Sequence, residues 1–317
     1  MSLADYLWKK IWQLIPTVFG VVTLVFIVIR LIPGDASSHI AGDNISGEAL
    51  EALRAKLGLD VPVWQQFLNY LLDVIRFDLG TTMVTGQPVA QLIMEALPIT
   101  FMIALLTVLL SCIIAVTLGT LAAFSAHKGK KMLDQIMTWI TMLVDLMPSF
   151  WMALLLMLLF TLTLGWLPAT GSIDYSDPLG ILQRIALPLI VLCMGQISTI
   201  ARMTRTAVLE VLNEDYIRTA RAFGTPQIIV VFRHALKNAA MPIITVTGLA
   251  FGTLMNGTVI TEFIFSIPGM GSLLINGIKM RDYTLVQGVI LVYSMLFIVV
   301  NMLTDIIYRY MDPRVKY

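Results

Sequence analysis

Six long apolar stretches separate the polar segments of this chain, and each is long enough to cross a membrane as a helix. About 20 consecutive, mostly apolar residues span the hydrocarbon core of a bilayer as a helix. With 58% hydrophobic and 13% charged residues, the chain is also more apolar than a soluble domain of this size. We therefore predict an all-α integral membrane protein with six spans, at residues 11–32, 97–126, 134–163, 185–209, 242–264 and 286–308.

The first apolar stretch could be either a cleaved signal peptide or a permanent anchor. Its apolar run is longer than the roughly 7–15 residues of a typical signal sequence, so we expect an uncleaved anchor over residues 1–33. Pro33 and Gly34 are placed to end it. Six spans put both chain termini on the same side of the membrane.

The positive charges indicate which side that is. Cytoplasmic loops of membrane proteins carry an excess of Lys and Arg. With the N-terminus inside, 14 of the 21 Lys and Arg residues fall on the inner side and seven on the outer side. This bias predicts cytoplasmic termini. It also places in the cytoplasm the region between the fourth and fifth spans, with Arg202, Arg205, Arg218, Arg221, Arg233 and Lys237.

Residues 34–95 form a long outer segment with eight acidic and three basic residues. Apolar side chains recur at helical spacing at Leu50, Leu53 and Leu57, and again between Phe67 and Ile75. We expect two or three short helices folded back on the outer surface. The pattern leaves two interpretations open, a docking surface for a partner protein or a lid that only covers the bundle.

The polar stretch at residues 213–243, between two apolar spans, predicts two short helices with a break between them. Asn213 can cap the first helix, and Glu214 and Asp215 in its first turn oppose the positive end of the helix dipole. Gly224 is placed to end that helix, because glycine adopts a left-handed conformation without steric cost. A solvated loop is the simplest alternative for such a stretch.

The second short helix is predicted from its own start signals. Thr225 can cap it, and Pro226 suits the first helical position, where its missing N–H is not needed. This helix carries Arg233, His234 and Lys237 and runs into the apolar segment that begins near Pro242.

The same stretch resembles a known motif. Arg-Thr-Ala-Arg-Ala-Phe-Gly at 218–224, His-Ala-Leu-Lys-Asn-Ala at 234–239 and Met-Pro-Ile at 241–243 are similar to the EAA loop of ABC transporter permeases, in the variant of the dipeptide, oligopeptide and nickel importers. Phe223 departs from the family, which usually has a basic residue there. Other segments are also similar, including Pro-Gly-Asp at 33–35 and Asp-Pro-Arg at 312–314, so the resemblance runs almost end to end.

The resemblance implies a type I ABC importer permease whose transmembrane domain covers residues 94–306, followed by a cytoplasmic tail at 307–317. Its partners would be a second permease subunit, two ATP-binding subunits and an extracytoplasmic solute-binding protein in the cytoplasmic membrane of a bacterium or archaeon. A coupling helix near 214–224 would sit in a cleft on the ATPase. The residues expected to couple are Glu214, Asp215, Tyr216, Arg218, Thr219, Ala220, Arg221 and Gly224.

Asp145 lies within the third apolar stretch, where the resemblance does not explain it. A carboxylate inside a membrane is costly and normally faces the bundle interior or a water-filled cavity. It could line the translocation path and favour substrates with a positive group. Alternatively, it could pair with a polar group on a neighbouring helix such as Arg202 or Thr204.

The chain shows no constellation for catalysis or cofactor binding. It contains no Gly-rich phosphate loop, no HExxH and no Ser/His/Asp arrangement, so we expect a translocation subunit without cofactor or metal that depends on separate ATPases. Cys112 and Cys193 lie inside apolar stretches and are expected to pack as small hydrophobic residues. A self-sufficient secondary transporter or channel is the alternative from another class, and a membrane enzyme is a third. Di- or oligopeptides are the first expected cargo, with glutathione, nickel chelates and murein peptides as alternatives within the same family.

Overall fold

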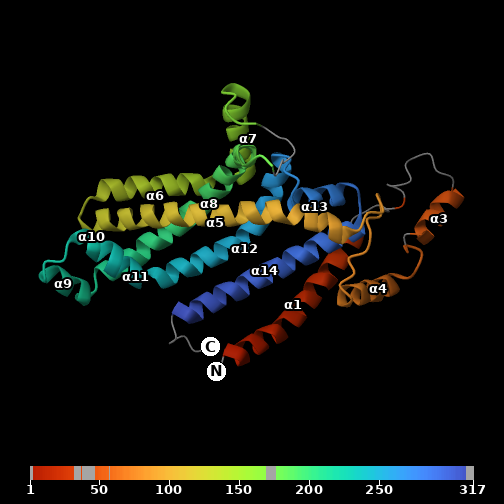
Figure 1. The fold of residues 1–317 in the computed structure, drawn as a ribbon, viewed down its shortest axis with the longest axis horizontal. Helices are drawn as coiled ribbons and strands as arrows, with labels where there is room; N and C mark the ends of the chain where they lie inside the picture. Colours follow the sequence, from red (N-terminus) through yellow and green to blue (C-terminus); the bar gives the residue numbers. More distant parts are fainter. Residues whose placement is uncertain (1–2, 32–36, 38–46, 57, 169–175, 312–317) are drawn as a thin grey trace. The chain divides into compact units, whose positions relative to one another are not determined.

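The computed structural model describes residues 3–31, 37, 47–56, 58–168 and 176–311. Within those ranges the regular elements are helical, apart from one isolated antiparallel bridge between Thr81 and Pro88 (Figure 1). The helices are α1 (Leu3–Leu31), α3 (Gly47–Lys56), α4 (Val63–Ile75), α5 (Val89–His127), α6 (Lys131–Leu146), α7 (Ser149–Leu156), α8 (Pro178–Leu212), α9 (Asp215–Ala222), α10 (Gln227–Ile229), α11 (Leu236–Asn238), α12 (Ala240–Ile264), α13 (Met270–Lys279) and α14 (Tyr283–Met311), with π-helical segments at Met157–Thr163 and Val230–Ala235.

Among the described residues, three helices are long and apolar enough to cross a membrane, namely α5, α8 and α14. Two further spans arise if each bent helix pair is counted as one, giving up to five, and Ile15–Leu31 of α1 is a shorter apolar helix. The described residues thus confirm the all-helical prediction and contain three to five candidate membrane spans. The predicted ends at Pro33–Gly34 and in the tail after Met311 lie outside the described residues.

The predicted third span, 134–163, is not one continuous helix. Asp134–Leu146 and Ser149–Thr163 meet at an angle of 96°. Met147, between the two helices, has an extended backbone with ψ 120°. Pro148 follows it, and a proline disfavours the helical conformation of the residue before it. A second bend, of 61°, joins Gln227–Asn238 to Ala240–Met255.

Two other spans begin earlier than the apolar pattern predicts. Helix α5 starts at Val89 and includes Pro98, and α8 starts at Pro178 and includes Pro188. The early start of α8 has a local cause, since the Asp177 carboxylate accepts a hydrogen bond from the Gly180 N–H at 3.0 Å. This is a capped start with proline at the first helical position.

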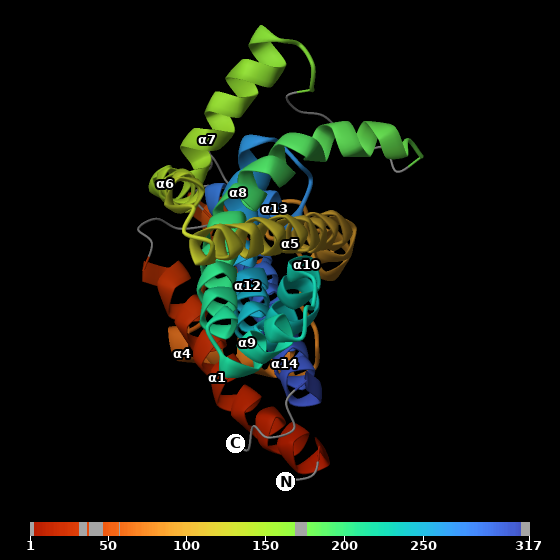
Figure 2. The ribbon, with the colours of Figure 1, turned by 90° about the vertical axis from the view of Figure 1, so that its left-hand side faces the viewer.

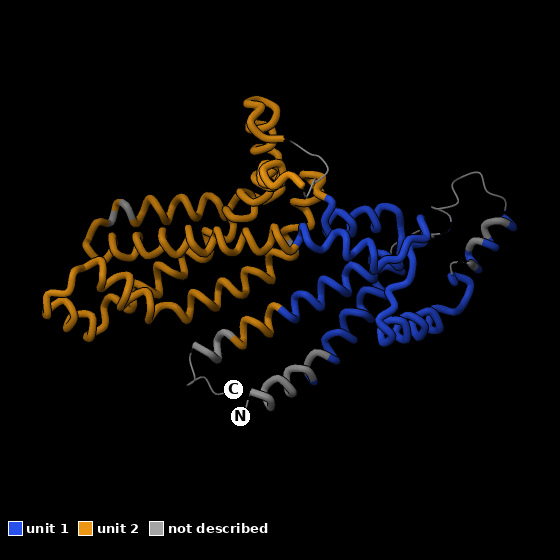
Figure 3. Tube along the Cα trace, viewed as in Figure 1, with its two compact units in different colours: residues 1–100, 268–299 blue, residues 101–267, 300–317 orange. Residues whose placement is uncertain are grey.

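The chain forms two compact units (Figure 3). Unit 1 comprises residues 1–100 and 268–299, and unit 2 comprises residues 101–267 and 300–317. In unit 1 the first turns of α5 pack against α13 and α14 through a buried cluster formed by Val89, Ile93, Ala96, Met270, Leu285 and Val289. The Thr100 hydroxyl accepts a hydrogen bond from the Met270 N–H at 2.9 Å and ties α5 to the start of α13.

The outer segment contains α3 and α4, so the prediction of short helices in residues 34–95 is confirmed for the described part of it. The turn before α13 has its left-handed residue at Ser266, with φ 51°. Ser266 follows the end of α12, and the Ile267 N–H donates back to the Glu262 carbonyl at 2.9 Å. Helix termination therefore sets this turn, while Gly269 has an extended backbone (φ −102°, ψ 178°).

In unit 2, α8 lies against α5, α6 and α12. Gly119 of α5 is needed for close approach to α8, because a Cβ atom there would lie 2.5 Å from the Ala201 carbonyl oxygen and 2.7 Å from the Thr204 Cβ. Small residues of this kind let membrane helices pack backbone to backbone. Helices α9 and α10 lie side by side at one end of unit 2 in both views (Figures 1 and 2).

Candidate functional site

The polar stretch between α8 and α12 folds as predicted into two short helical segments with a break, and a buried cluster holds them together. Ile217 of α9 is fully buried (0% exposed). It packs with Leu212 at the end of α8 and with Val230, Val231 and Ala235 of the following segment. An eight-residue helix is not stable alone in water, so this packing is what holds α9 in place.

Gly224 ends α9 as the sequence predicts. Its φ is +76°, its N–H donates to the Arg221 carbonyl at 2.9 Å, and the Thr225 N–H donates to the Ala220 carbonyl at 3.2 Å. These backbone bonds satisfy carbonyl groups at the end of the helix, and they require a left-handed residue after the C-cap.

The predicted caps of both short helices are wrong by one residue. Asn213 ends α8, where its side chain donates to the Leu209 carbonyl at 3.0 Å, and Glu214 occupies the N-cap position of α9 without a side-chain capping bond. Pro226 is itself the N-cap of α10, and its extended ψ of 137° makes its carbonyl, rather than that of Thr225, the first acceptor of the helix.

Several other side chains of α9 face solvent. Asp215, Tyr216 and Arg218 are exposed, and the Arg218–Asp215 ion pair, at 3.2 Å, stabilises little because water screens it. Phe223, the position where the sequence departs from the family resemblance, is 86% exposed.

Arg221 differs from Arg218 because it contacts the rest of unit 2. Its Nη1 lies 2.6 Å from Nε2 of His127, the last residue of α5. Since arginine can only donate, this contact requires a neutral His127 whose Nε2 accepts. Arg221 therefore connects α9 to the end of α5, which the sequence did not indicate. Tyr216 also has a partner, because its hydroxyl accepts a hydrogen bond from the Asn238 amide at 3.0 Å.

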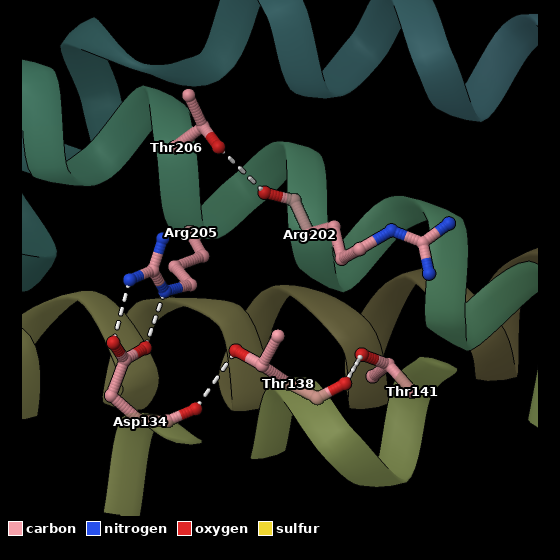
Figure 4. A network of polar contacts seen from close by, with 6 residues as sticks. All are labelled: Asp134, Thr138, Thr141, Arg202, Arg205 and Thr206. Atoms are coloured by element: carbon pink, nitrogen blue, oxygen red, sulfur yellow. Dashed lines mark hydrogen bonds and ion pairs between the residues drawn. The ribbon is translucent and has the colours of Figure 1, made fainter. Parts of the chain in front are cut away.

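A polar contact zone joins α6 to α8 (Figure 4). The Arg205 guanidinium binds the Asp134 carboxylate through two hydrogen bonds, with Nη2 to Oδ2 at 2.6 Å. Arg202 forms an ion pair with Asp145 at 2.5 Å and donates to the Ser198 hydroxyl at 2.8 Å. Of the two environments expected for Asp145, the structure shows the pairing with Arg202.

Sequence reasoning missed the Asp134–Arg205 pair. An acidic residue in the first turn of α6 and a basic residue near the end of α8 were visible signals, but the pattern did not show that these two helix ends meet. A separate cavity of about 140 Å³ lies where α6, α7, α8 and α12 meet, with Met147, Met152, Met194, Gln196 and Thr253 in its wall. Asp145 is not among the described residues that line it.

Two family models match the chain. The model described as binding-protein-dependent transport system inner membrane component matches residues 115–317, and an N-terminal model of the same systems matches residues 3–104. The chain is 41% identical over 310 residues to a putative peptide transport system permease protein of Brucella abortus, with 98% of both chains covered.

Two further curated relatives have names that state a cargo. A dipeptide transport system permease protein of Alkalihalophilus pseudofirmus is 37% identical, covering 98% of this chain and 99% of the relative. A glutathione transport system permease protein of Escherichia coli K12 is 34% identical, covering 99% of both. Among solved structures, the crystal structure of an amino acid ABC transporter with histidines shares the fold, with a TM-score of 0.52 and 14% identity over 70% of this chain and 94% of that one.

Proposed function

The chain belongs to the family of binding-protein-dependent transport system inner membrane components, and on that premise we propose that it is the permease subunit of an ATP-driven importer of di- or oligopeptides. We choose peptides as the cargo because this chain matches relatives named for peptide and dipeptide transport over nearly their full length. The glutathione relative favours a second candidate, glutathione, itself a small peptide, through the same machinery. Nickel chelates are a third candidate cargo, which only the family resemblance supports.

The assembly we propose has this subunit, a second permease, two ATP-binding subunits and an extracytoplasmic solute-binding protein. This subunit would contribute six spans, with α1 as the first and each bent pair as one, and both termini in the cytoplasm. We propose the division into an anchor at 1–33, an outer segment at 34–95, a transmembrane domain at 94–306 and a tail at 307–317. Lys and Arg distribution supports this orientation.

We propose α9 as the coupling helix. The geometry supports this role because Ile217 and the Gly224 turn fix the helix to unit 2, while Asp215, Tyr216 and Arg218 remain exposed. Closure of the ATP-binding subunits would displace α9, and the Arg221–His127 contact and the buried cluster would pass that displacement to α5 and α8. Glu214, Thr219, Ala220 and Gly224 complete the proposed set, with Ala220 and Ala222 allowing close approach to the ATPase.

Reconstitution tests the proposal directly. We expect proteoliposomes with all four kinds of subunit to take up a labelled dipeptide only when ATP is inside and the solute-binding protein is outside. Omitting either should reduce uptake to background. Uptake by this chain alone, driven by an ion gradient, would instead establish the secondary transporter, and ATP-driven uptake without the binding protein would contradict the assignment to an importer of this type.

Asp145 has two proposed roles that make different predictions. If it lines the path, Asp145→Asn should lower uptake of cationic dipeptides several-fold relative to neutral ones. If its role is the ion pair with Arg202, the variant should lower the thermal stability of the subunit and leave that ratio unchanged, because Arg202 loses its partner. Arg202→Gln in the Asp145→Asn background separates the two, since it removes the uncompensated cation and should restore stability.

A further inference from the structure

Unit 1 contains a polar cavity that has no role in the coupling described above. Its volume is about 210 Å³, below the roughly 300–1,000 Å³ of sites for drug-sized ligands. The wall comes from α1, α4, the loop after α4 and the start of α14, and includes Arg30, Tyr70, Asp73, Asp78 and Gln287. A cavity of this size suits a very small peptide or a single amino acid and excludes a long one.

The Arg30 guanidinium in this wall is held in one orientation. Its Cζ lies 3.5 Å from the centroid of the Phe26 ring, a cation–π contact. Its Nε and Nη2 both donate to the Gln66 side-chain oxygen, at 3.2 and 2.6 Å. Gln66 is fixed in turn, because its own N–H donates to the Val61 carbonyl at 2.9 Å. One edge of the guanidinium is therefore fully used.

The other edge of the Arg30 guanidinium is not fully used. Arg30 Nη1 is buried without an acceptor, and the same holds for Nε2 of Gln287, which lines the same cavity. A buried donor without an acceptor is costly, and more so when it carries charge. A carboxylate is the group that would satisfy either donor, since its oxygens accept from a guanidinium and from an amide N–H. Burial raises the pKa of Tyr70 to about 12, so its hydroxyl stays protonated beside them.

Opposite charges line the cavity elsewhere. Asp73 and Asp78 are both part of the wall, and Asp78 is positioned by accepting a hydrogen bond from the Gly80 N–H at 2.8 Å. Within the described part of the chain, Arg30 makes no ion pair with either carboxylate. The cavity therefore holds separated positive and negative groups. A simple anion would meet two carboxylates and a simple cation would meet Arg30, so a ligand with both charges is favoured over either.

We propose that this cavity binds a zwitterionic dipeptide, with its carboxylate at Arg30 and Gln287 and its ammonium group at Asp73 and Asp78. The site lies in unit 1, and the cavity lined by Met147, Met152 and Met194 lies in unit 2, so the two cavities are distinct. The inference rests on the proposed function only in taking peptide as the cargo. It makes the permease contribute to the choice of substrate alongside the solute-binding protein.

Equilibrium binding to the assembled permease and ATPase subunits in nanodiscs, without ATP and without the solute-binding protein, tests this proposal. Radiolabelled alanylalanine is the probe. N-acetyl-alanylalanine lacks the ammonium group and alanylalaninamide lacks the carboxylate. We expect saturable binding of alanylalanine, and at least tenfold weaker competition by each blocked analogue. Absence of saturable binding, or equal competition by all three compounds, would overturn the site.

Matched variants locate the binding. Arg30→Met should weaken alanylalanine binding at least tenfold, whereas Arg76→Met, the same change at an exposed position at the end of α4, should not. Asp73→Asn should weaken the binding of alanylalanine but not that of N-acetyl-alanylalanine, which lacks the ammonium group. Asp60→Asn, at another exposed position, is the matched control. Because Asp73 is exposed, its substitution should leave the fold of the subunit intact. The Asp73→Asn variant therefore tests the site even if Arg30→Met does not assemble.

Failure of this inference is distinct from failure of the proposed function. If ATP-driven dipeptide uptake is normal and Arg30→Met and Asp73→Asn both bind like the wild type, only the subsite is wrong. If binding follows the expected order but uptake does not depend on ATP and the solute-binding protein, the subsite stands and the importer assignment falls.

Discussion

Replacing Ile217 by alanine is expected to remove most ATP-driven uptake while leaving the subunit in the membrane. Ile217 is the fully buried residue of α9 and its main contact with the cluster of Leu212, Val230, Val231 and Ala235. Truncating a buried isoleucine to alanine costs about 2–5 kcal/mol. That loss falls on an eight-residue helix with little stability of its own, so α9 should detach locally while the spans remain folded.

Uptake and ATP hydrolysis measured together in proteoliposomes check this prediction. We expect uptake to fall at least tenfold, with hydrolysis no longer stimulated by the loaded binding protein. Ile113→Ala is the matched control, because Ile113 of α5 is 66% exposed and its truncation leaves no cavity. Wild-type uptake by the Ile217 variant would contradict the role of α9 as the coupling helix.

Gly224→Val is expected to uncouple ATP hydrolysis from transport. The expected cause is the backbone conformation of this residue and not a side-chain clash. Nothing lies within 4 Å of a Cβ placed on Gly224, so the added Cβ itself meets no neighbouring atom. The conformation is the obstacle, since φ is +76° and a left-handed backbone costs an ordinary L-residue about 1–2 kcal/mol. Valine is disfavoured further by its branched Cβ. Such a cost shifts the ratio of capped to uncapped α9 by roughly 5- to 30-fold.

Gly224→Asn separates backbone conformation from side-chain size. Asparagine is larger than glycine but tolerates the left-handed region, so it should keep most of the coupled uptake that valine loses. The measurement is the ratio of dipeptide taken up to ATP hydrolysed, with membrane insertion checked by immunoblot. Equal loss in both variants would mean that the space next to Gly224, occupied in the complex by a partner, decides the effect.

The site residues show where sequence reasoning reached and where it stopped. Gly224 was predictable because one residue type supplies a left-handed turn at low cost, and its position after a polar helix signals an end. The Asn213 and Thr225 caps were misplaced by one residue, because several polar residues in a row can each serve and only the local backbone selects among them. Arg221 and Arg218 look alike in sequence, yet one contacts His127 and the other faces solvent.

The sequence by itself determined that this is a helical membrane protein with a structured polar stretch between two apolar spans, because composition, span length and turn chemistry are local properties. The tertiary structure alone decided which distant segments meet. It brings Arg205 to Asp134, Arg30 to Gln66, and residues 268–299 into one unit with residues 1–100. Such contacts depend on how helices cross, and on bends such as the one at Met147–Pro148, and a hydrophobic pattern read along one dimension carries no information about either.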